Sequence, residues 1–261
     1  MHEAFFRREG PLLVATELTR GPWSDALMHG GPPTALLGSA IARAGPEPER
    51  FQVARLTFEL VRPLAIGALR VETEVLRAGK QVQRLAARLL QADGTELARA
   101  QGVRIRRAAV ALPPDPRPAP ALPAREGVAP FAFPFFDPAQ VAYHRGVEVR
   151  IVRGEWGPGP LVAWMRPVVP LVAGEASTPL ERLLILVDAE SGVCPPVDPR
   201  VWQFPNPDLT VYLERDPAGE WFALEAGSRA GPEGIGLVWS ALHDDRGPLG
   251  RAAQSLVVDR R

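Results

Sequence analysis

The chain has 261 residues, of which 46% are apolar and 23% charged, so it has the composition of an ordinary globular protein with room for two small domains or one composite domain. Its 30 basic and 30 acidic residues give a net charge of zero without a long run of either sign, which argues against nucleic acid or an anionic membrane surface as a partner. A single cysteine, Cys194, excludes an internal disulfide and cannot build a metal site alone.

The N-terminal sequence has none of the marks of a targeting segment. Residues 1–8 contain no positive stretch that a long apolar one follows. The longest aliphatic run, 183–187, is far too short to span a bilayer. We therefore expect a cytoplasmic protein that does not cross a membrane.

The first half of the chain predicts one helix followed by an antiparallel meander. Residues 34–43 are small and apolar enough for a buried helix, and Gly45-Pro46 would end it. Turn residues then separate four segments that suit strands, at 55–62, 68–77, 81–91 and 97–106. The last segment alternates between two sets of side chains, as a strand with one buried and one wet face does.

Residues 111–130 are rich in proline and carry no periodic pattern. We expect them to form an extended linker over the surface, although a ligand motif for a proline-binding partner is the other reading of this composition. The linker would separate a first unit, residues 1–110, from a second unit, residues 131–261.

The second half repeats the order of the first. Thr178 suits an N-cap, Pro179 the first helical position and Glu181 the end of a capping box, so a helix should begin here. Strands fit the segments 208–215, 220–228, 233–243 and 249–259. Each half is thus predicted to be a central helix followed by a curled antiparallel sheet.

The two halves also resemble each other in sequence. Residues 56–62 match residues 209–215 at an offset of 153 positions. The same offset puts Gln101 on Gln254. A repeat this long is not a solenoid, which needs three or more short units to bury a core, so we expect an internal dimer.

Six motifs follow one another in the order Gly21-Pro22-Trp23, His29 to Pro33, Phe58 to Pro63, Leu186-Val187-Asp188, Asn206 to Thr210 and Ala253 to Leu256. With these motifs the chain resembles the acyl-CoA thioesterase II (TesB-like) family of double-hotdog proteins over nearly its whole length. The resemblance implies an α+β fold, a double hotdog made of two fused helix-plus-antiparallel-sheet repeats. It also implies an acyl-CoA substrate and assembly into a homo-oligomer.

Asp188 stands out on the second predicted helix. An apolar stripe runs along this helix at Leu180, Leu183, Leu184 and Val187. Asp188 falls on the same stripe, so its carboxylate should point toward the sheet. Burying an unpaired carboxylate is costly, so Asp188 must find donors or titrate abnormally. The other reading is a half-exposed residue at the helix C-terminus, where the helix dipole disfavours a negative charge.

Gln254 is a second polar residue on an apolar face, which it shares with Ala252, Leu256 and Val258 of the last strand. A buried amide needs partners, which would be either a water facing a carboxylate or the neighbouring backbone. For Gln101 in the first half we prefer backbone partners.

The family resemblance gives these residues roles. Asp188, Asn206 and Gln254 match the water-activating trio of the thioesterase II family, which consists of an aspartate on this helix, a polar residue on this strand and a glutamine on the last strand. A hydroxyl residue is usual at the middle position, so Asn206 is a departure, although an amide also positions water. By this resemblance Asp188 is the base, and the two amides hold the water.

His29, Gly30 and Gly31 precede the first helix and are candidates for substrate binding. Glycines let backbone N–H groups approach a ligand, and a helix start favours a developing oxyanion. The same residues would also suit a simple turn. His29 could instead be a general base, with Asp25 as its partner or as the acid residue of single-hotdog thioesterases, or it could be a loop or interface residue without a catalytic role.

Other catalytic classes lack their motifs. No glycine-serine-glycine elbow follows a strand, and Cys194 lies beside prolines without a cationic setting, so we expect neither a serine nor a cysteine nucleophile. Neither a dinucleotide fingerprint nor a phosphate-binding loop is present, so no organic cofactor is implied. We predict no metal site, since no ligand spacing involves the remaining histidines, His2, His144 and His243.

The sequence therefore predicts an acyl-CoA thioesterase that hydrolyses a fatty acyl or related acyl thioester by direct attack of water. The acyl chain would lie in an apolar groove, with coenzyme A across the seam of the two halves. Two alternatives stay open. One is an enoyl-thioester hydratase on the same fold that uses Asp25 and His29, and the other is a non-catalytic acyl-thioester binding protein.

Overall fold

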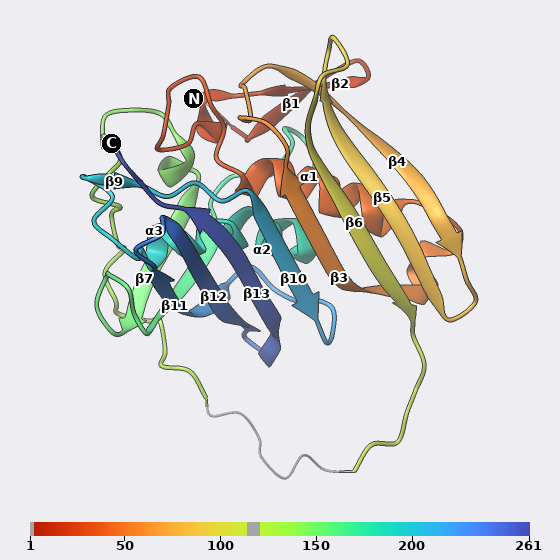
Figure 1. Ribbon diagram of the computed structural model, residues 1–261. Helices are drawn as coiled ribbons and strands as arrows, with labels where there is room; N and C mark the ends of the chain where they lie inside the picture. The colour runs from red at the N-terminus through yellow and green to blue at the C-terminus, as the bar shows by residue number, and fades with distance from the viewer. Residues whose placement is uncertain (1–2, 114–120) are drawn as a thin grey trace.

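The computed structural model describes residues 3–113 and 121–261, and most of their strands form one large antiparallel sheet (Figure 1). The first half contributes β1 (Phe6–Glu9), β2 (Leu12–Ala15), β3 (Phe51–Leu60), β4 (Ala68–Ala78), β5 (Val82–Gln91) and β6 (Glu96–Arg106). The second half contributes β7 (Val147–Arg153), β8 (Leu161–Pro167), β10 (Asp208–Leu213), β11 (Phe222–Ala230), β12 (Ile235–Asp244) and β13 (Gly247–Val257). A separate pair is formed by β9 (Trp202–Gln203) and β14 (Asp259–Arg260).

The sheet runs in the order β1-β2-β4-β5-β6-β3-β10-β13-β12-β11-β8-β7, so the two halves meet where β3 pairs with β10. At this seam Thr57 lies opposite Thr210, and their hydroxyl oxygens are 3.3 Å apart. These two threonines are the matching residues of the sequence repeat. Equivalent strands therefore meet antiparallel, as in a dimer with a twofold axis.

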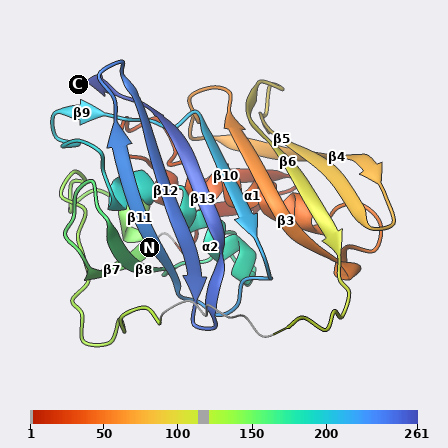
Figure 2. The same ribbon diagram turned by 60° about the horizontal axis from the view of Figure 1, so that its bottom comes forward.

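The helices α1 (Gly31–Arg43) and α2 (Pro179–Val187) lie together on one face of the sheet, and the short α3 (Glu190–Val193) follows α2 (Figure 2). Gly38 allows α1 to pack closely against α2, since a Cβ on Gly38 would lie 2.2 Å from Leu184 Cδ1. Glu181 ties the two helices, because it accepts from Ser39 Oγ at 2.5 Å and pairs with Arg43 at 2.7 Å. None of the helices in the described ranges is long and apolar enough to cross a membrane.

The described residues also form short 3-10 helices at Glu17–Thr19, Pro48–Arg50 and Tyr143–Arg145. The expected central helix of the first half begins three residues earlier than its apolar run. Gly31, Pro32 and Pro33 fill its first turn, where a missing N–H costs no hydrogen bond. In the second half the predicted capping box is present, with the Glu181 N–H donating to Thr178 Oγ1 at 3.2 Å.

The match of Gln101 with Gln254 is wrong in the structure. Gln101 lies opposite Thr57 and is exposed, whereas Ala253 lies opposite Thr210 and Gln254 is buried. The cause is the preceding turn, which spans residues 92–94 in the first half and only residues 245–246 in the second. A one-residue slip moves a side chain to the other face of a strand.

The place that corresponds to Gln254 is taken by Gly102 in the first half. Ala98 and Ala100 on the same buried face of β6 are small, because α1 packs closely on this part of the strand, whereas Arg104 at the far end of this face is large and fully buried. A Cβ on Gly102 would lie 2.3 Å from Ile41 Cγ2. The buried face of the predicted alternation is therefore the one with Ala98, Ala100 and Gly102.

The proline-rich segment is described at residues 111–113 and 121–130, and its part at 114–120 lies outside the described residues. Residues 111–113 are exposed and without regular structure. Further along, Trp164 Nε1 donates to Pro123 O at 3.0 Å, and Arg125 pairs with Asp245 at 2.5 Å. This end of the segment thus packs against the second half.

Candidate active site

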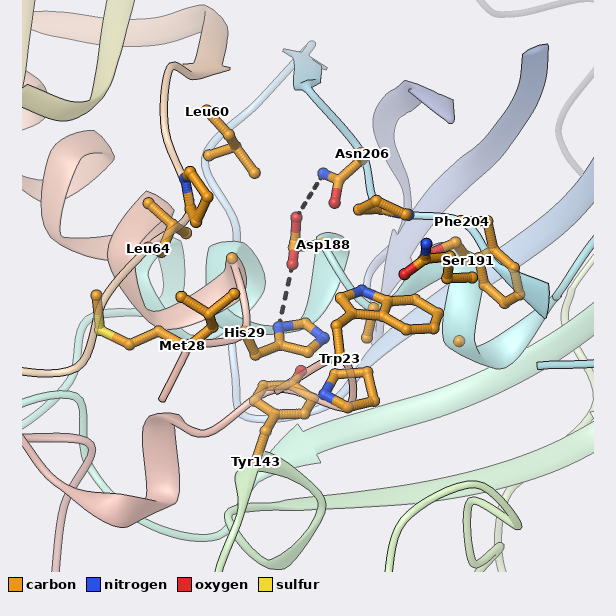
Figure 3. A pocket seen from close by; sticks show the side chains of 18 of the residues that line it. Trp23, Met28, His29, Leu60, Leu64, Tyr143, Asp188, Ser191, Phe204 and Asn206 are labelled. Atoms are coloured by element: carbon orange, nitrogen blue, oxygen red, sulfur yellow. Dashed lines mark hydrogen bonds and ion pairs between the residues drawn. The ribbon is translucent and has the colours of Figure 1, made fainter. Parts of the chain in front are cut away.

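A cavity of about 450 Å³ lies between the two halves of the chain. Its walls come from the loop before α1, the turn after β3, the segment after the proline-rich region, the end of α2, α3 and the loop before β10. Asp188 and His29 face each other in its middle (Figure 3). The site is therefore built from both halves.

Asp188 caps the C-terminus of α2, and only 4% of its surface is exposed. Its Oδ1 accepts from Asn206 Nδ2 at 2.8 Å, and its Oδ2 lies 3.0 Å from His29 Nδ1. The carboxylate of Asp188 thus points inward and has nitrogen partners, as the apolar stripe of the helix led us to expect. Two of the three residues that resemble the family trio, Asp188 and Asn206, are in direct contact.

Gly30 makes this approach possible. A Cβ on Gly30 would lie 2.7 Å from both carboxylate oxygens of Asp188, closer than side chains pack. The glycine is therefore required by the carboxylate beside it, and it lines the cavity. Gly31 does not line the cavity, since it faces α2, where a Cβ would meet Ile185 O at 2.2 Å.

His29 is held flat against Tyr143, with ring centroids 3.7 Å apart and planes 4° from parallel. Tyr143 is fixed in turn by its hydroxyl, which donates to Ile185 O at 2.8 Å. Burial lowers the pKa of His29, and the charge of Asp188 opposes this shift, so the ring is neutral at pH 7. Sequence reasoning missed Tyr143, because it lies far along the chain in a segment without periodicity.

One proton decides the contacts of His29. The Gly31 N–H is directed at His29 Nδ1 at 3.1 Å, and Asp188 Oδ2 lies near the same nitrogen. A proton on Nδ1 bonds the ring to Asp188, whereas a proton on Nε2 leaves Nδ1 to accept from Gly31. An ionised Asp188 favours the first form.

The helix start offers fewer N–H groups to a ligand than the sequence suggested. Pro32 and Pro33 have none, and the Gly31 N–H is turned to His29. The Thr34 N–H donates to Gly30 O at 3.0 Å. Among the described residues that open α1, the Gly30 N–H has no acceptor, and the Gly31 N–H loses its acceptor when His29 Nδ1 carries the proton.

Gln254 is buried, with 1% of its surface exposed, but it does not line the cavity. Its Nε2 donates to Val187 O at 3.1 Å, directly before Asp188. Its Oε1 is buried and meets no hydrogen-bond donor within the described ranges. The structure therefore brings Gln254 to the end of α2 and not to the carboxylate of Asp188.

Glu190 is a buried carboxyl that sequence reasoning did not single out. It is completely buried, and its Oε1 accepts from Ser240 Oγ. Burial raises the pKa of Glu190 to about 8. The hydrogen bond from Ser240 acts to lower this pKa, and the negative charge of Asp188 acts to raise it. The sequence signal that could have identified Glu190 as buried is its helical spacing of three residues from Val187, which belongs to the apolar stripe.

The remaining candidates lie apart from this centre. Asp25 is exposed and accepts from Gln140 Nε2 at 2.7 Å, so the carboxylate beside His29 is Asp188 and not Asp25. Cys194 is buried, and burial raises the pKa of its thiol to about 11. His2 lies outside the described residues. Within the part of the chain that the structure describes, no cluster of three or more His, Cys, Asp or Glu side chains could hold a metal ion.

Comparison with family models identifies both halves. Residues 19–105 match the acyl-CoA thioesterase N-terminal domain, and residues 113–258 match the acyl-CoA thioesterase C-terminal domain. No curated protein matches the chain.

Solved structures agree in fold. A conserved protein of unknown function with a hot dog fold from Alicyclobacillus acidocaldarius is 18% identical, with 98% of this chain and 95% of that chain covered and a TM-score of 0.71. The acyl-CoA thioesterase II TesB2 from Mycobacterium marinum is also 18% identical, with 97% and 94% covered and a TM-score of 0.65. The chain thus has the hotdog fold, belongs to the acyl-CoA thioesterase family and is a thioester hydrolase.

Proposed function

We propose that this chain hydrolyses acyl-CoA thioesters by direct attack of a water molecule, with Asp188 as the general base. The observation that carries the proposal is a buried carboxylate in the wall of an apolar cavity, with a nitrogen partner at each oxygen. Each oxygen keeps a second lone pair with which it can accept a proton from water. A positioned base of this kind contributes roughly a hundredfold to ten-thousandfold in rate.

His29 and Asn206 would orient that carboxylate. With Asp188 ionised, the Nδ1–H of His29 donates to Oδ2, and the stacked Tyr143 fixes the ring plane. Asn206 uses its amide nitrogen for Asp188 Oδ1 and, at 3.3 Å, for Asp208 O. Its carbonyl oxygen is then available to accept the second proton of the attacking water.

Two further groups would complete the reaction. The Gly30 N–H could donate to the thioester carbonyl as negative charge develops on its oxygen. Gln254 would act one step away, because its bond to Val187 O fixes the helix end that carries Asp188. This geometry favours positioning through the backbone over a direct contact with the water.

The architecture that we propose is a double hotdog, with fused repeats at residues 1–110 and 131–261 and a linker at 111–130. Its support is the sequence repeat, whose equivalent strands pair at the seam through Thr57 and Thr210. The base and His29 come from different repeats. One chain would therefore hold a complete site only when both repeats are present.

A hydratase acting on enoyl thioesters needs a histidine paired with an acid. The pair in this structure is His29 with Asp188, and it could serve that chemistry as well. The two reactions differ in their products, because hydration leaves the thioester intact. A crotonyl-CoA assay that follows both free thiol and loss of the conjugated double bond separates them.

The direct test is a thiol-release assay with acyl-CoAs from acetyl to palmitoyl. Free coenzyme A should appear together with one equivalent of carboxylic acid. No thiol release from any member of the series would contradict the proposed function. Loss of the double bond of crotonyl-CoA without thiol release would favour the hydratase.

A further inference from the structure

The cavity has two unlike sides, which are separated by the pair of His29 and Asp188. Figure 3 shows Met28, Leu60 and Leu64 on one side of this pair and Trp23, Phe204 and Ser191 on the other. The first side is aliphatic, and the second is predominantly aromatic. A thioester held at Asp188 would have to send its acyl group to one side and its thiol arm to the other.

The aliphatic side opens to solvent. It continues into Val61, Arg62 and Pro63, which form the turn after β3 and are all exposed. Arg62 Nη1 donates to Glu96 O at 2.8 Å, and no carboxylate pairs with Arg62 among the described residues. A cation without a counter-ion at the rim suits the phosphate groups of coenzyme A.

The aromatic side is mostly buried, and Pro205 and Val257 at its edge are exposed. Phe133, Phe136 and Phe204 line it and are 7%, 8% and 1% exposed. Phe133 also packs against Phe135, with ring centroids 5.6 Å apart, and Phe135 stacks on Trp156 at 6.3 Å. The Trp156 Nε1–H donates to Gly192 O at 3.0 Å and so joins this aromatic wall to α3.

We propose, on the basis of the function proposed above, that the acyl group enters the aromatic side and that the thiol arm of coenzyme A leaves over the aliphatic side toward Arg62. The acyl group is uncharged, because the polar side chains that line the aromatic side beyond the central pair, Ser191 and Gln203, are neutral. A dicarboxylic acyl group would leave its second carboxylate unpaired.

Gly192 offers a test of the aromatic side. A Cβ on Gly192 would touch Phe135 Cζ at 3.4 Å and Phe133 Cε1 at 3.7 Å, which are ordinary contacts. Gly192→Val should thus fold and take volume from the acyl site. The ratio of kcat/KM for octanoyl-CoA over acetyl-CoA should fall about tenfold, the scale of steric crowding in a packed site. Gly67→Val is the control, because space around Gly67 is open.

Two arginines test the direction of the thiol arm. Arg62 lies at the aliphatic rim, and Arg261 lies over Trp23, 5.2 Å from the ring centroid. We compare KM for octanoyl-CoA with KM for octanoyl-N-acetylcysteamine, which lacks the phosphates. Arg62→Ala should raise the ratio of these constants about tenfold, as expected for a lost charge-assisted hydrogen bond. Arg261→Ala should change the ratio by less than about twofold.

The opposite direction would be established if Arg261→Ala, and not Arg62→Ala, raised the ratio. An unchanged chain-length ratio in Gly192→Val, equal to that of Gly67→Val, would also overturn the inference. If Gly192→Val does not fold, Gly192→Ala takes its place with the same two outcomes, since its single methyl group makes ordinary contacts with Phe135 and Phe133. Absence of any acyl-CoA hydrolysis would instead reject the proposed function itself.

Discussion

His29 Nδ1 and Asp188 Oδ2 lie 3.0 Å apart, although 159 positions separate the two residues along the chain. The histidine precedes the helix of the first half, and the aspartate ends the helix of the second. Neither half contains both members of the pair. Catalysis should consequently depend on how firmly the halves stay joined.

Cleavage in the exposed segment 108–113 should leave the protein assembled and active. The seam pairing of β3 with β10 and the contact of α1 with α2 bury apolar surface that each half alone would expose. Limited proteolysis followed by native gel filtration and a thioesterase assay checks this. Two fragments that elute separately would contradict the internal-dimer account.

Gly30→Ala should lower kcat by about a hundredfold or more while the fold is kept. The added methyl would meet both oxygens of Asp188 at 2.7 Å, so the carboxylate must move away from Asn206 and His29. Small displacements of a catalytic group are costly in rate. Gly67→Ala is the matched control, since open space surrounds that residue. Equal activity of the two variants would remove the steric link between Gly30 and Asp188.

Glu190 should make the protein less stable as the pH rises. Its pKa is about 8 in the folded protein, against an ordinary value of 4.5. The unfolded chain releases this proton first, so the stabilisation present below pH 4.5 is lost progressively as the pH approaches 8 and stays lost above it.

Glu190→Gln should remove this dependence. The amide cannot ionise, so the variant should gain on the order of a few kcal/mol over the wild type between pH 5 and 8. Urea unfolding at several pH values measures the difference, with the exposed Glu233→Gln as control. A pH dependence that is the same in wild type and Glu190→Gln would show that Glu190 does not titrate in this way.

The chain should form a homo-oligomer through the outer face of β12. Ile235, Leu237 and Trp239 are 68%, 47% and 38% exposed on that strand. At the offset of 153, Leu237 corresponds to Arg84 on β5, which shows that the fold itself permits a charged residue here. Leu237→Arg should therefore weaken association without unfolding the protein. Light scattering that gives the wild type a mass near 28.3 kDa at all concentrations would count against this prediction.

Local patterns in the sequence were sufficient to predict the central helices. The capping residues Thr178 and Glu181 mark the start of α2, and the apolar stripe of that helix places Asp188 toward the interior. Asn206 could be named together with Asp188 because of the family resemblance, which implies a polar residue on this strand as a partner of the aspartate.

Other features depend on contacts that no local pattern contains. β1 and β2 are four residues each, too short for a periodic signal, and they are defined by pairing with distant strands. The faces of Gln101 and Gln254 depend on a turn that is one residue shorter in the second half. The contact of His29 with Asp188 depends on the packing of the two halves.

The most direct test is the rate of acyl-CoA hydrolysis by Asp188→Asn, with His29→Ala and Gln254→Ala measured beside it. Asparagine keeps the size of the side chain but cannot take a proton from water, so kcat should fall about a hundredfold to ten-thousandfold in a folded protein. Gln254→Ala should cost less, and the double variant should be less than additive with Asp188→Asn, because both residues act on one site. If Asp188→Asn keeps its activity while His29→Ala abolishes it, the base is His29 and the assignment to Asp188 is wrong.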